Sequence, residues 1–474
     1  MTELKRDLGI WAALAIVVGT VIGSGIFRVP QSMILNVGTV PLVFAVWIAG
    51  GLLSLAGALT YAELAAALPG AGGEYVYLSE AYGPLWGFLY SWTQMWVAKS
   101  GSIATLATAF FEYTAHFVPQ FETVWFTAGP FSVKYGQIFA LALILLLGGI
   151  NYLGVRVGGD VQVAVTGVKI GLIALLILAG LLYSHPAALG TLPPSESSLP
   201  PTPPVFAGFI AALVGALWAY DGWNNVGMVA SEIKNPQRNL PLALIGGTLG
   251  VIAIYMLANW AYFRVLSPSE VGAHKLVAAE MMQRIFVSRG TASGSAAASA
   301  VSIAAMISIF AALNGSILTG ARVPYAAARD GLFFRSAARV HPAFHTPGVS
   351  ILMLSAWSSA LVLSGKYEEL FDFVIFGSWI LYAMATASVF VLRRKRPDLP
   401  RPYMTIGYPV VPLLFLAGAT VLEISTLWAK PRESIAGIIL ILLGLPFYFY
   451  WRGRMSRKSQ DTSRAPGNTS TGLK

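Results

Sequence analysis

The sequence predicts an all-α membrane protein that crosses the bilayer many times. Of its 474 residues, 56% are hydrophobic and only 11% are charged, whereas a soluble domain carries roughly 25% charged residues. Apolar runs long enough to cross a bilayer recur along the whole chain, and short basic loops separate several of them. A chain with so few polar side chains cannot cover a water-facing surface, so these runs are expected to lie in lipid.

A membrane-spanning helix needs about 20 apolar residues, because each residue adds about 1.5 Å along the axis. Reading the chain with that window predicts twelve transmembrane helices. They cover residues 9–35, 41–68, 84–112, 135–154, 160–184, 205–232, 239–264, 292–327, 347–364, 367–392, 408–428 and 434–452. The first run is too long for a signal-peptide core and lacks a small-residue cleavage site, so we expect it to be retained.

The basic residues favour one orientation. An even number of spans puts both termini on one side. With the N-terminus in the cytoplasm, and with basic residues toward the end of a span counted with the loop they adjoin, 20 of the 31 Lys and Arg residues lie on the cytoplasmic side and 9 on the outer side, while Lys99 and Lys169 lie deep within spans. The basic outer loop 264–291 is an exception. Positive loops stay cytoplasmic, so both termini are predicted to be cytoplasmic. This placement accounts for the net charge of +10, and no nucleic-acid partner is expected.

Two segments are expected to lie outside the membrane. Residues 185–204 are rich in proline and are predicted to be an outer linker, and residues 453–474 read as a disordered cytoplasmic tail. The chain has no cysteine, so it offers no thiolate ligands. His341 and His345 are separated by a proline that breaks a helical face. No metal site and no cofactor are expected.

Two of the spans are interrupted near their middle. The stretch "VVGTVIGSGIFRVP" (17–30) places three glycines inside the first span, and "YDGWNN" (220–225) interrupts the sixth. Glycine costs about 1 kcal/mol relative to alanine inside a helix. Non-helical backbone is tolerated at this depth only where it lines a polar cavity. Close helix packing is the alternative for the first span alone. Two breaks five spans apart favour a transporter built from inverted five-helix repeats.

Broken helices offer a binding site for a zwitterion. The N-terminus of a half-helix presents free N–H groups and the positive end of the helix dipole to an anion such as a carboxylate. The opposed C-terminus presents carbonyl groups to an ammonium. The pair of breaks therefore predicts a site for an α-amino acid. No set of nucleophile, base and acid appears among the spans, so no catalytic residues are expected. A channel would need a symmetric filter or rings of charge.

Four blocks of the sequence carry a family resemblance. They are "GTVIGSGIF" (19–27), "YAELAAALPGAGGEYVYLSEAYGPLWGFL" (61–89), "AYDGWNNVGMVASEIKNPQRNLP" (219–241) and "LNGSILTGARVPYAAARDGLFFRSAARVHPAFHTP" (313–347). In this order and spacing they resemble the L-type amino acid transporters of the APC superfamily, from about residue 8 to 452. The resemblance implies a leucine-transporter-like fold with alternating access. Its two inverted repeats would be residues 1–184 and 205–392, followed by the last two spans in 393–452.

The resemblance also implies which residues hold the substrate. Ser24 and Gly25 look like the backbone donors to its carboxylate. The carbonyls of Val21, Trp218 and Asp221 look like the acceptors for its ammonium, and Trp218 takes the place of an aromatic that closes the site from outside. The other pocket positions that match are Asn224, Ser378 and Trp379.

Three charged residues have open roles. Asp221 stands where the eukaryotic members have glycine; its carboxylate either faces polar substrates in the pocket or bonds to the broken backbone from behind. Lys169 matches a lysine that ties the fifth span to the first where sodium-coupled relatives hold an ion. The alternative is that it extends along the helix to the cytoplasmic face. Lys99 matches a basic position that either lines the outer vestibule or extends outward.

The resemblance favours a sodium-independent exchanger of small neutral L-amino acids. A proton-coupled amino acid symporter remains the alternative, because Lys169 is titratable; a channel or membrane enzyme is remote. Eukaryotic members join a heavy chain through an outer-loop cysteine, and this chain has none, so no such partner is expected beyond substrate and lipid. We expect a prokaryotic, multi-pass protein of the inner membrane.

Overall fold

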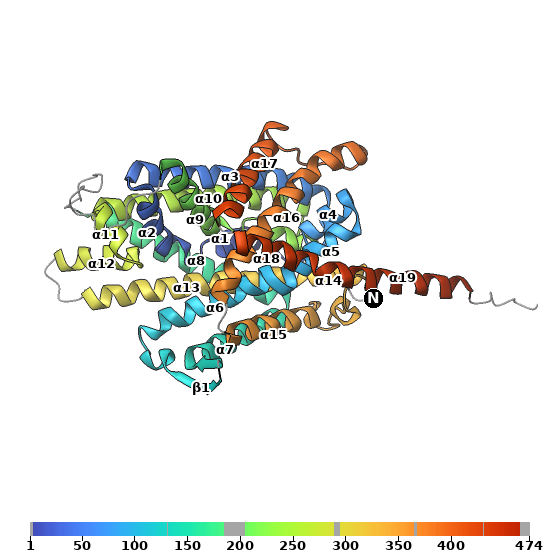
Figure 1. The fold of residues 1–474 in the computed structure, drawn as a ribbon, viewed down its shortest axis with the longest axis horizontal. Helices are drawn as coiled ribbons and strands as arrows, with labels where there is room; N and C mark the ends of the chain where they lie inside the picture. The colour runs from blue at the N-terminus through green and yellow to red at the C-terminus, as the bar shows by residue number, and fades with distance from the viewer. Residues whose placement is uncertain are drawn as a thin grey trace, which may run out of the picture.

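The computed structural model describes residues 3–129, 131–183, 204–288, 294–364, 367–429 and 431–464 of the chain. Within them the protein is almost wholly helical, so the predicted all-α class is confirmed. The long helices run side by side along the long axis of the molecule (Figure 1). Almost all of the predicted linker 185–204, and residues 465–474 of the predicted tail, lie outside the described residues.

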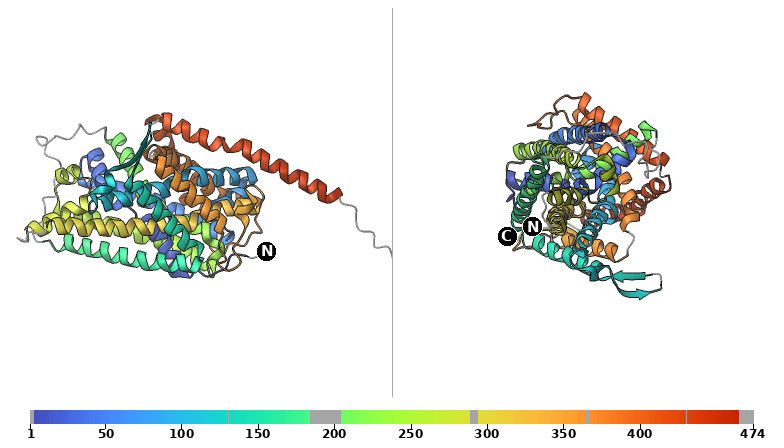
Figure 2. Two further views of the ribbon diagram at one scale, coloured as in Figure 1. Left: turned by 90° about the horizontal axis from the view of Figure 1, so that it is seen from below. Right: turned by 90° about the vertical axis from the view of Figure 1, so that its left-hand side faces the viewer.

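The first part of the chain forms eight α-helices, two short irregular helices and a hairpin. Their bounds are α1 (Ile10–Val21), α2 (Gly25–Val37), α3 (Val40–Ala67), α4 (Glu74–Tyr82), α5 (Pro84–Thr93), η1 (Gln94–Ala98), α6 (Lys99–Ala115), η2 (Pro119–Glu122), β1 (Val124–Ala128), β2 (Phe131–Lys134), α7 (Tyr135–Tyr152) and α8 (Val155–Leu181). The two strands pair antiparallel, and the hairpin projects sideways from the bundle (Figure 2).

In the second part, every regular element that the structure describes is a helix. Its elements are α9 (Val205–Tyr220), η3 (Asn225–Glu232), α10 (Pro236–Val265), α11 (Pro268–Ala273), α12 (Val277–Ser288), α13 (Gly294–Gly320), α14 (Arg322–Arg329), η4 (Arg335–Ala338), α15 (Gly348–Ser364), α16 (Tyr367–Lys395), α17 (Val410–Ala429), α18 (Pro431–Leu442) and α19 (Gly444–Arg464).

Within the described ranges, eight helical segments are long and apolar enough to cross a membrane, and the bent pair α1–α2 makes a ninth. The remaining predicted spans are also helical. Residues 84–112 are divided among α5, η1 and α6, α15 has 17 residues, and α16 covers the span predicted over 367–392. Each of the twelve predicted spans therefore meets helix, while the number that cross the bilayer remains a prediction.

The end of the chain differs from the expected tail. Instead of losing structure near residue 453, α19 continues to Arg464. Its last turns hold Arg, Lys, Met and Gln, which favour helix, and the first proline after them is Pro466. The start of the chain and the far end of α19 lie at the same end of the bundle (Figures 1 and 2). We call this the N-terminal end.

Both predicted breaks are present, and they face each other. α1 stops at Val21 and α2 starts at Gly25, with a bend of 40° between them. α9 stops at Tyr220, and a turn leads into η3. Gly222 in that turn has φ +104°, and a Cβ on it would lie 3.2 Å from the Thr20 hydroxyl oxygen, so only glycine fits. The Thr20 hydroxyl donates to the Gly222 carbonyl at 3.0 Å, which joins the two breaks directly.

A buried ion pair ties three elements together at the N-terminal end. Arg322 of α14 donates to both carboxylate oxygens of Glu232 in η3, at 2.7 and 3.0 Å, and both side chains are fully buried. The backbone N–H of Leu8, just before α1, donates to the Glu232 carbonyl at 3.0 Å, and the Lys234 N–H donates to the Leu8 carbonyl at 2.8 Å. The beginnings of α1 and α14 and the end of η3 are thereby held together.

Removing one partner of this pair should destabilise the protein strongly. Arg322→Met leaves the Glu232 carboxylate buried and unpaired, which costs about 3–5 kcal/mol. The matched control is Arg396→Met, whose partner Glu80 is 43% exposed, and such surface pairs contribute about 0–1 kcal/mol. Thermal unfolding in detergent, followed by size-exclusion chromatography, measures both. Equal melting temperatures for the two variants would contradict the structural role of Arg322.

Candidate functional site

A pocket lies between the two breaks. Its walls come from the α1–α2 break, from α6, from the α9–η3 turn, from α13 and from α16. Eight of the ten predicted site residues line it. They are Val21, Ser24, Gly25, Lys99, Trp218, Asp221, Ser378 and Trp379. The structure thus gathers residues from positions 21 to 379 of the chain around one cavity.

The start of α2 forms one end of the pocket. Ser24 is the N-cap residue and Gly25 the first residue of α2, where the first N–H groups of a helix lack partners within the helix. α9 approaches this turn closely: a Cβ on Gly25 would lie 2.9 Å from the Cβ of Ala219 and 3.0 Å from its Cα. Glycine therefore allows the helix start to pack against the end of α9, and its N–H groups and dipole suit an anion.

The carbonyl groups at the ends of α1 and α9 already accept hydrogen bonds within the protein. The Val21 carbonyl accepts from the Gly23 N–H at 2.9 Å and lies 3.2 Å from the Tyr255 hydroxyl, whose single hydrogen has a closer acceptor in the Ala219 carbonyl at 2.7 Å. The Trp218 carbonyl accepts from the Asp221 N–H at 3.1 Å. The carbonyls at both helix ends are therefore partly satisfied within the protein.

Lys99 and Asp221 are both held in the pocket wall. The Lys99 ammonium donates to the Asn225 side-chain carbonyl at 2.8 Å, and the Tyr382 hydroxyl donates to the Asp221 carboxylate at 3.2 Å. Lys99 is the first residue after the π-helical turn η1, a kind of turn that inserts one extra residue and often occurs at functional sites. Lys99 is buried and does not extend outward. Asp221 lines the pocket, and its carboxylate also accepts from Tyr382 and from the backbone at Gly222, so both of the predicted contacts are possible from one position.

Lys169 lies behind the pocket. Its side chain is fully buried in α8, and its ammonium donates to the carbonyls of Gly19, at 2.9 Å, and of Ile22. The Ser308 hydroxyl of α13 donates to the carbonyls of Ile22 and Gly23 at 3.0 and 3.2 Å. The contacts expected of a tether between the fifth and first spans are therefore present, and the side chain does not extend to a membrane surface.

Asn224 is the predicted pocket residue that faces elsewhere. It is fully buried, and its amide donates to Glu74 of α4, while the next residue, Asn225, lines the pocket. Sequence reasoning also missed two polar residues on the pocket face of α6, Ser102 and Thr105. Their spacing from Lys99, three and six residues along a helix, was a usable signal.

The two pocket tryptophans have different surroundings. Trp379 is buried and stacks on Phe415, with ring centroids 5.6 Å apart and planes at 15°, so it is part of the bundle core and not an interfacial anchor. Trp218 is partly buried beside the pocket. In the described ranges no three His, Asp or Glu side chains gather in a way that could hold a metal ion.

Comparisons with known proteins agree with the geometry of this pocket. Residues 8–445 match the amino acid permease family. The chain is 33% identical over 456 residues to the serine/threonine exchanger SteT of Bacillus subtilis (strain 168), covering 95% of this chain and 98% of that protein. It is 31% identical over 465 residues to the mouse b(0,+)-type amino acid transporter 1, covering 96% and 91%.

A third relative is the mouse large neutral amino acids transporter small subunit 2, 32% identical over 454 residues, covering 95% of this chain and 82% of that protein. The family match and these relatives span almost the whole chain, including both breaks and the residues between them. The chain therefore belongs to the amino acid permease family.

Proposed function

We propose that this protein exchanges small neutral L-amino acids across a membrane without sodium, by alternating access to the pocket between the two breaks. The single observation that carries the proposal is that the start of α2, at Ser24 and Gly25, and the end of α9, at Trp218, line one cavity between the two breaks. A relative named as a serine/threonine exchanger and another named for large neutral amino acids support exchange and neutral substrates.

The polar lining supports a small, uncharged side chain. Ser102, Thr105 and Ser378 offer hydroxyl groups, while Trp218 and Trp379 limit the size of the cavity. The two charged groups of the wall have opposite signs and already have partners. A cationic or anionic substrate side chain would meet a like charge beside the opposite one, whereas a neutral polar side chain meets no net charge.

The position of Lys169 supports independence from sodium. Its ammonium already donates to two carbonyls that the α1 break leaves free, and a second cation there would meet direct repulsion. Proton-coupled symport is the alternative function, with Lys169 as its proton site. No carboxylate contacts the Lys169 ammonium in the described residues, which favours the tether.

The proposed topology follows the basic residues. The N-terminal end of the bundle carries the basic segments 321–342, 392–402 and 451–458, and positive loops stay in the cytoplasm. We therefore assign both termini to the cytoplasm, residues 1–184 and 205–392 to two inverted repeats, and the protein to a prokaryotic inner membrane. Without cysteine the chain forms no disulfide to a heavy chain.

Transport assays on purified protein in sodium-free proteoliposomes test the proposal. We expect labelled serine or threonine to enter vesicles preloaded with a neutral amino acid at least about tenfold faster than it enters empty vesicles. The reason is that an exchanger needs substrate on both sides of the membrane. An inward proton gradient should not rescue empty vesicles. Rapid uptake into empty vesicles driven by that gradient would replace the exchanger with the symporter.

Gly25→Val should abolish or strongly weaken transport. The added atoms would collide with the Ala219 backbone and cover the N–H groups at the start of α2, and overpacking of this kind costs about 1–3 kcal/mol, or roughly tenfold or more in affinity. The matched control is Gly167→Val, because a Cβ there meets nothing within 4 Å. A scintillation proximity assay measures substrate binding by the two variants. Unchanged affinity of the Gly25→Val variant would mean that Gly25 serves helix packing and not substrate binding.

Lys169→Ala should slow exchange by about tenfold or more, because each lost hydrogen bond from a charged group contributes about 1.5–3 kcal/mol. The ends of α1 would then lose their link to α8. Lys134→Ala is the control, since Lys134 lies at the hairpin and pairs with the exposed Glu122. Both variants are compared by exchange rate at pH 6, 7 and 8. Wild-type rates at every pH for the Lys169 variant would rule out both the tether and a proton site there.

A further inference from the structure

The loop before α4 packs directly on the broken sixth span. The Gly72 N–H donates to the Met228 carbonyl of η3 at 2.8 Å. Gly72 and Gly73 have φ of +101° and +56°, and a Cβ on Gly73 would lie 3.0 Å from the Met228 nitrogen. Both positions therefore require glycine. This close approach places Glu74, the first residue of α4, against the turn between α9 and η3.

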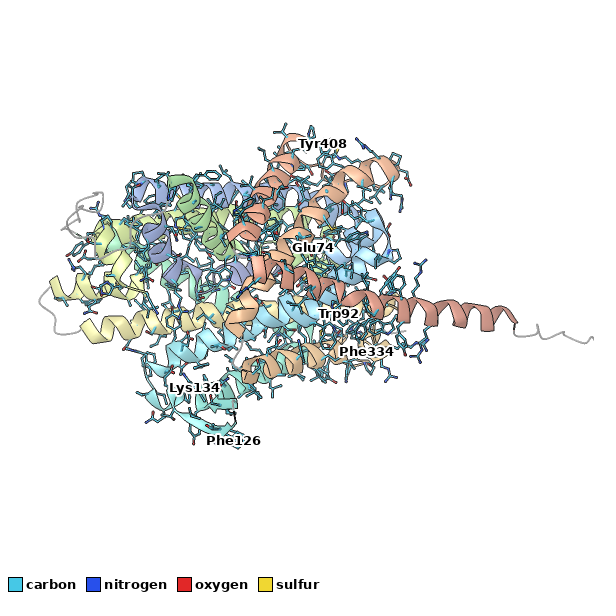
Figure 3. The ribbon with its side chains drawn as sticks, viewed as in Figure 1. Glu74, Trp92, Phe126, Lys134, Phe334 and Tyr408 are labelled. Carbon is cyan, nitrogen blue, oxygen red and sulfur yellow. The ribbon has the colours of Figure 1, made fainter. Side chains whose placement is uncertain are left out.

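Glu74 is a fully buried carboxyl group that contacts this turn. One oxygen accepts from the Asn224 amide, and the other accepts from the Tyr90 hydroxyl of α5 at 2.9 Å. α4 connects two apolar spans and is not itself one of them. Figure 3 shows Glu74 inside the bundle, toward the N-terminal end.

The Lys99 ammonium stands near two carboxyl groups, those of Glu74 and Asp221. Lys99 is close enough to both Glu74 and Asp221 to interact with each electrostatically. The titratable and charged groups that interact electrostatically with Glu74 are Tyr61 of α3, Tyr77 of α4, Tyr90 of α5, Lys99 of α6 and Tyr382 of α16. Asp221, after α9, interacts with Lys99 and Tyr382. With both carboxyl groups ionised, the cluster would keep a buried negative charge, which is costly.

The amide of Asn224 can pair with either form of Glu74. As placed, its nitrogen donates to the carboxylate, and its oxygen is buried without a donor among the described residues. Turning the amide by 180° presents the oxygen to Glu74 instead, and such orientations are set by the hydrogen-bond network. An amide oxygen pairs with a protonated carboxyl group, which donates, and not with a carboxylate. The site is thus built to accept a proton.

We propose that Glu74 is a proton-binding site, which holds a proton while the N-terminal end is closed and releases it to water when α4 separates from η3. This inference rests on the proposed alternating access. It places proton sensitivity at the loop that covers the sixth span, apart from Lys169. The transfer is a simple ionisation: the carboxyl O–H bond breaks and the proton passes to a water molecule that enters on opening.

The direction of the pH effect follows from burial. Loss of hydration raises the pKa of Glu74 to about 7, against the hydrogen bonds from Tyr90 and Asn224 and the charge of Lys99, which lower it. A hydrated Glu has a pKa of about 4.3. The closed conformation therefore binds the proton more tightly, so acid favours closure. Raising the pH from 6 to 8 should shift the equilibrium toward opening by about tenfold.

A thiol at Ser231 can report this opening. The chain has no cysteine, so Ser231→Cys introduces a single thiol of similar shape. Ser231 is half-buried in η3, but its hydroxyl is covered and has no partner in the described residues, so we expect a thiol in its place to react faster when η3 moves. Labelling by a maleimide is measured at pH 6 and 8 in this background, with Glu74 intact and with Glu74→Gln. Dividing the two rates at each pH cancels the intrinsic reactivity of the thiol.

We expect the rate with Glu74 intact, divided by the rate of the Gln variant, to rise about tenfold from pH 6 to pH 8, because Gln imitates the protonated form at every pH. Glu74→Asp should keep the pH response. Glu80→Gln, on the exposed face of the same helix, is the matched control and should label as the parent does. Size-exclusion profiles check that each variant is folded.

Equal ratios at pH 6 and pH 8 would overturn the proposal. It would also be overturned if Asp221→Asn removed the pH response while Glu74→Gln kept it. Labelling needs no substrate, so it judges the proton site separately from the proposed function. A protein that exchanges no amino acid but shows the tenfold response would retain the proton site and lose the exchanger.

Discussion

The structure depends on satisfying the backbone groups that two broken helices leave free inside an apolar bundle. An unpaired N–H or C=O there costs several kcal/mol, yet the breaks are needed to expose such groups to a ligand. Neighbouring side chains resolve the conflict. The Tyr255 hydroxyl of α10 lies between the carbonyls of Val21 and Ala219, and Lys169 and Ser308 donate to carbonyls at the end of α1. The start of α2, at Ser24 and Gly25, lines the pocket.

The same constraint explains where charge is buried. Lys169 and Lys99 lie within helices of the bundle, where a charged side chain is tolerated when it meets oxygen acceptors. The ammonium of Lys169 meets carbonyls of the first break, and that of Lys99 meets Asn225 beside the second. The Arg322–Glu232 ion pair joins α14 to η3 at the N-terminal end of the bundle. Lys169, Lys99 and the Arg322–Glu232 pair therefore each contact one of the breaks or a segment that flanks it.

Much of this arrangement could be predicted from the sequence. Glycines in the first span and polar residues in the sixth identify both breaks, and eight of ten predicted site residues reach one pocket. Local patterns cannot tell which of two adjacent asparagines faces that pocket, because the turn after α9 has no helical period. Nor could the sequence place Glu74 beside Asn224, since 150 residues separate them and only the packed loop before α4 brings them together. The extension of α19 was missed because polarity was taken for disorder, although its residues favour helix.

The hydrogen bond between Thr20 and Gly222 has a mechanical consequence. It joins the last turn of α1 to the turn after α9, so the two half-helices that form the pocket are linked at their hinge points. The Tyr255 hydroxyl contacts both half-helices close to this bond, at Val21 of α1 and at Ala219 of α9. We therefore expect a tilt of α1 to be transmitted to α9, so that the two half-helices move together about this contact. Substrate contacts with either half-helix should then influence the position of both.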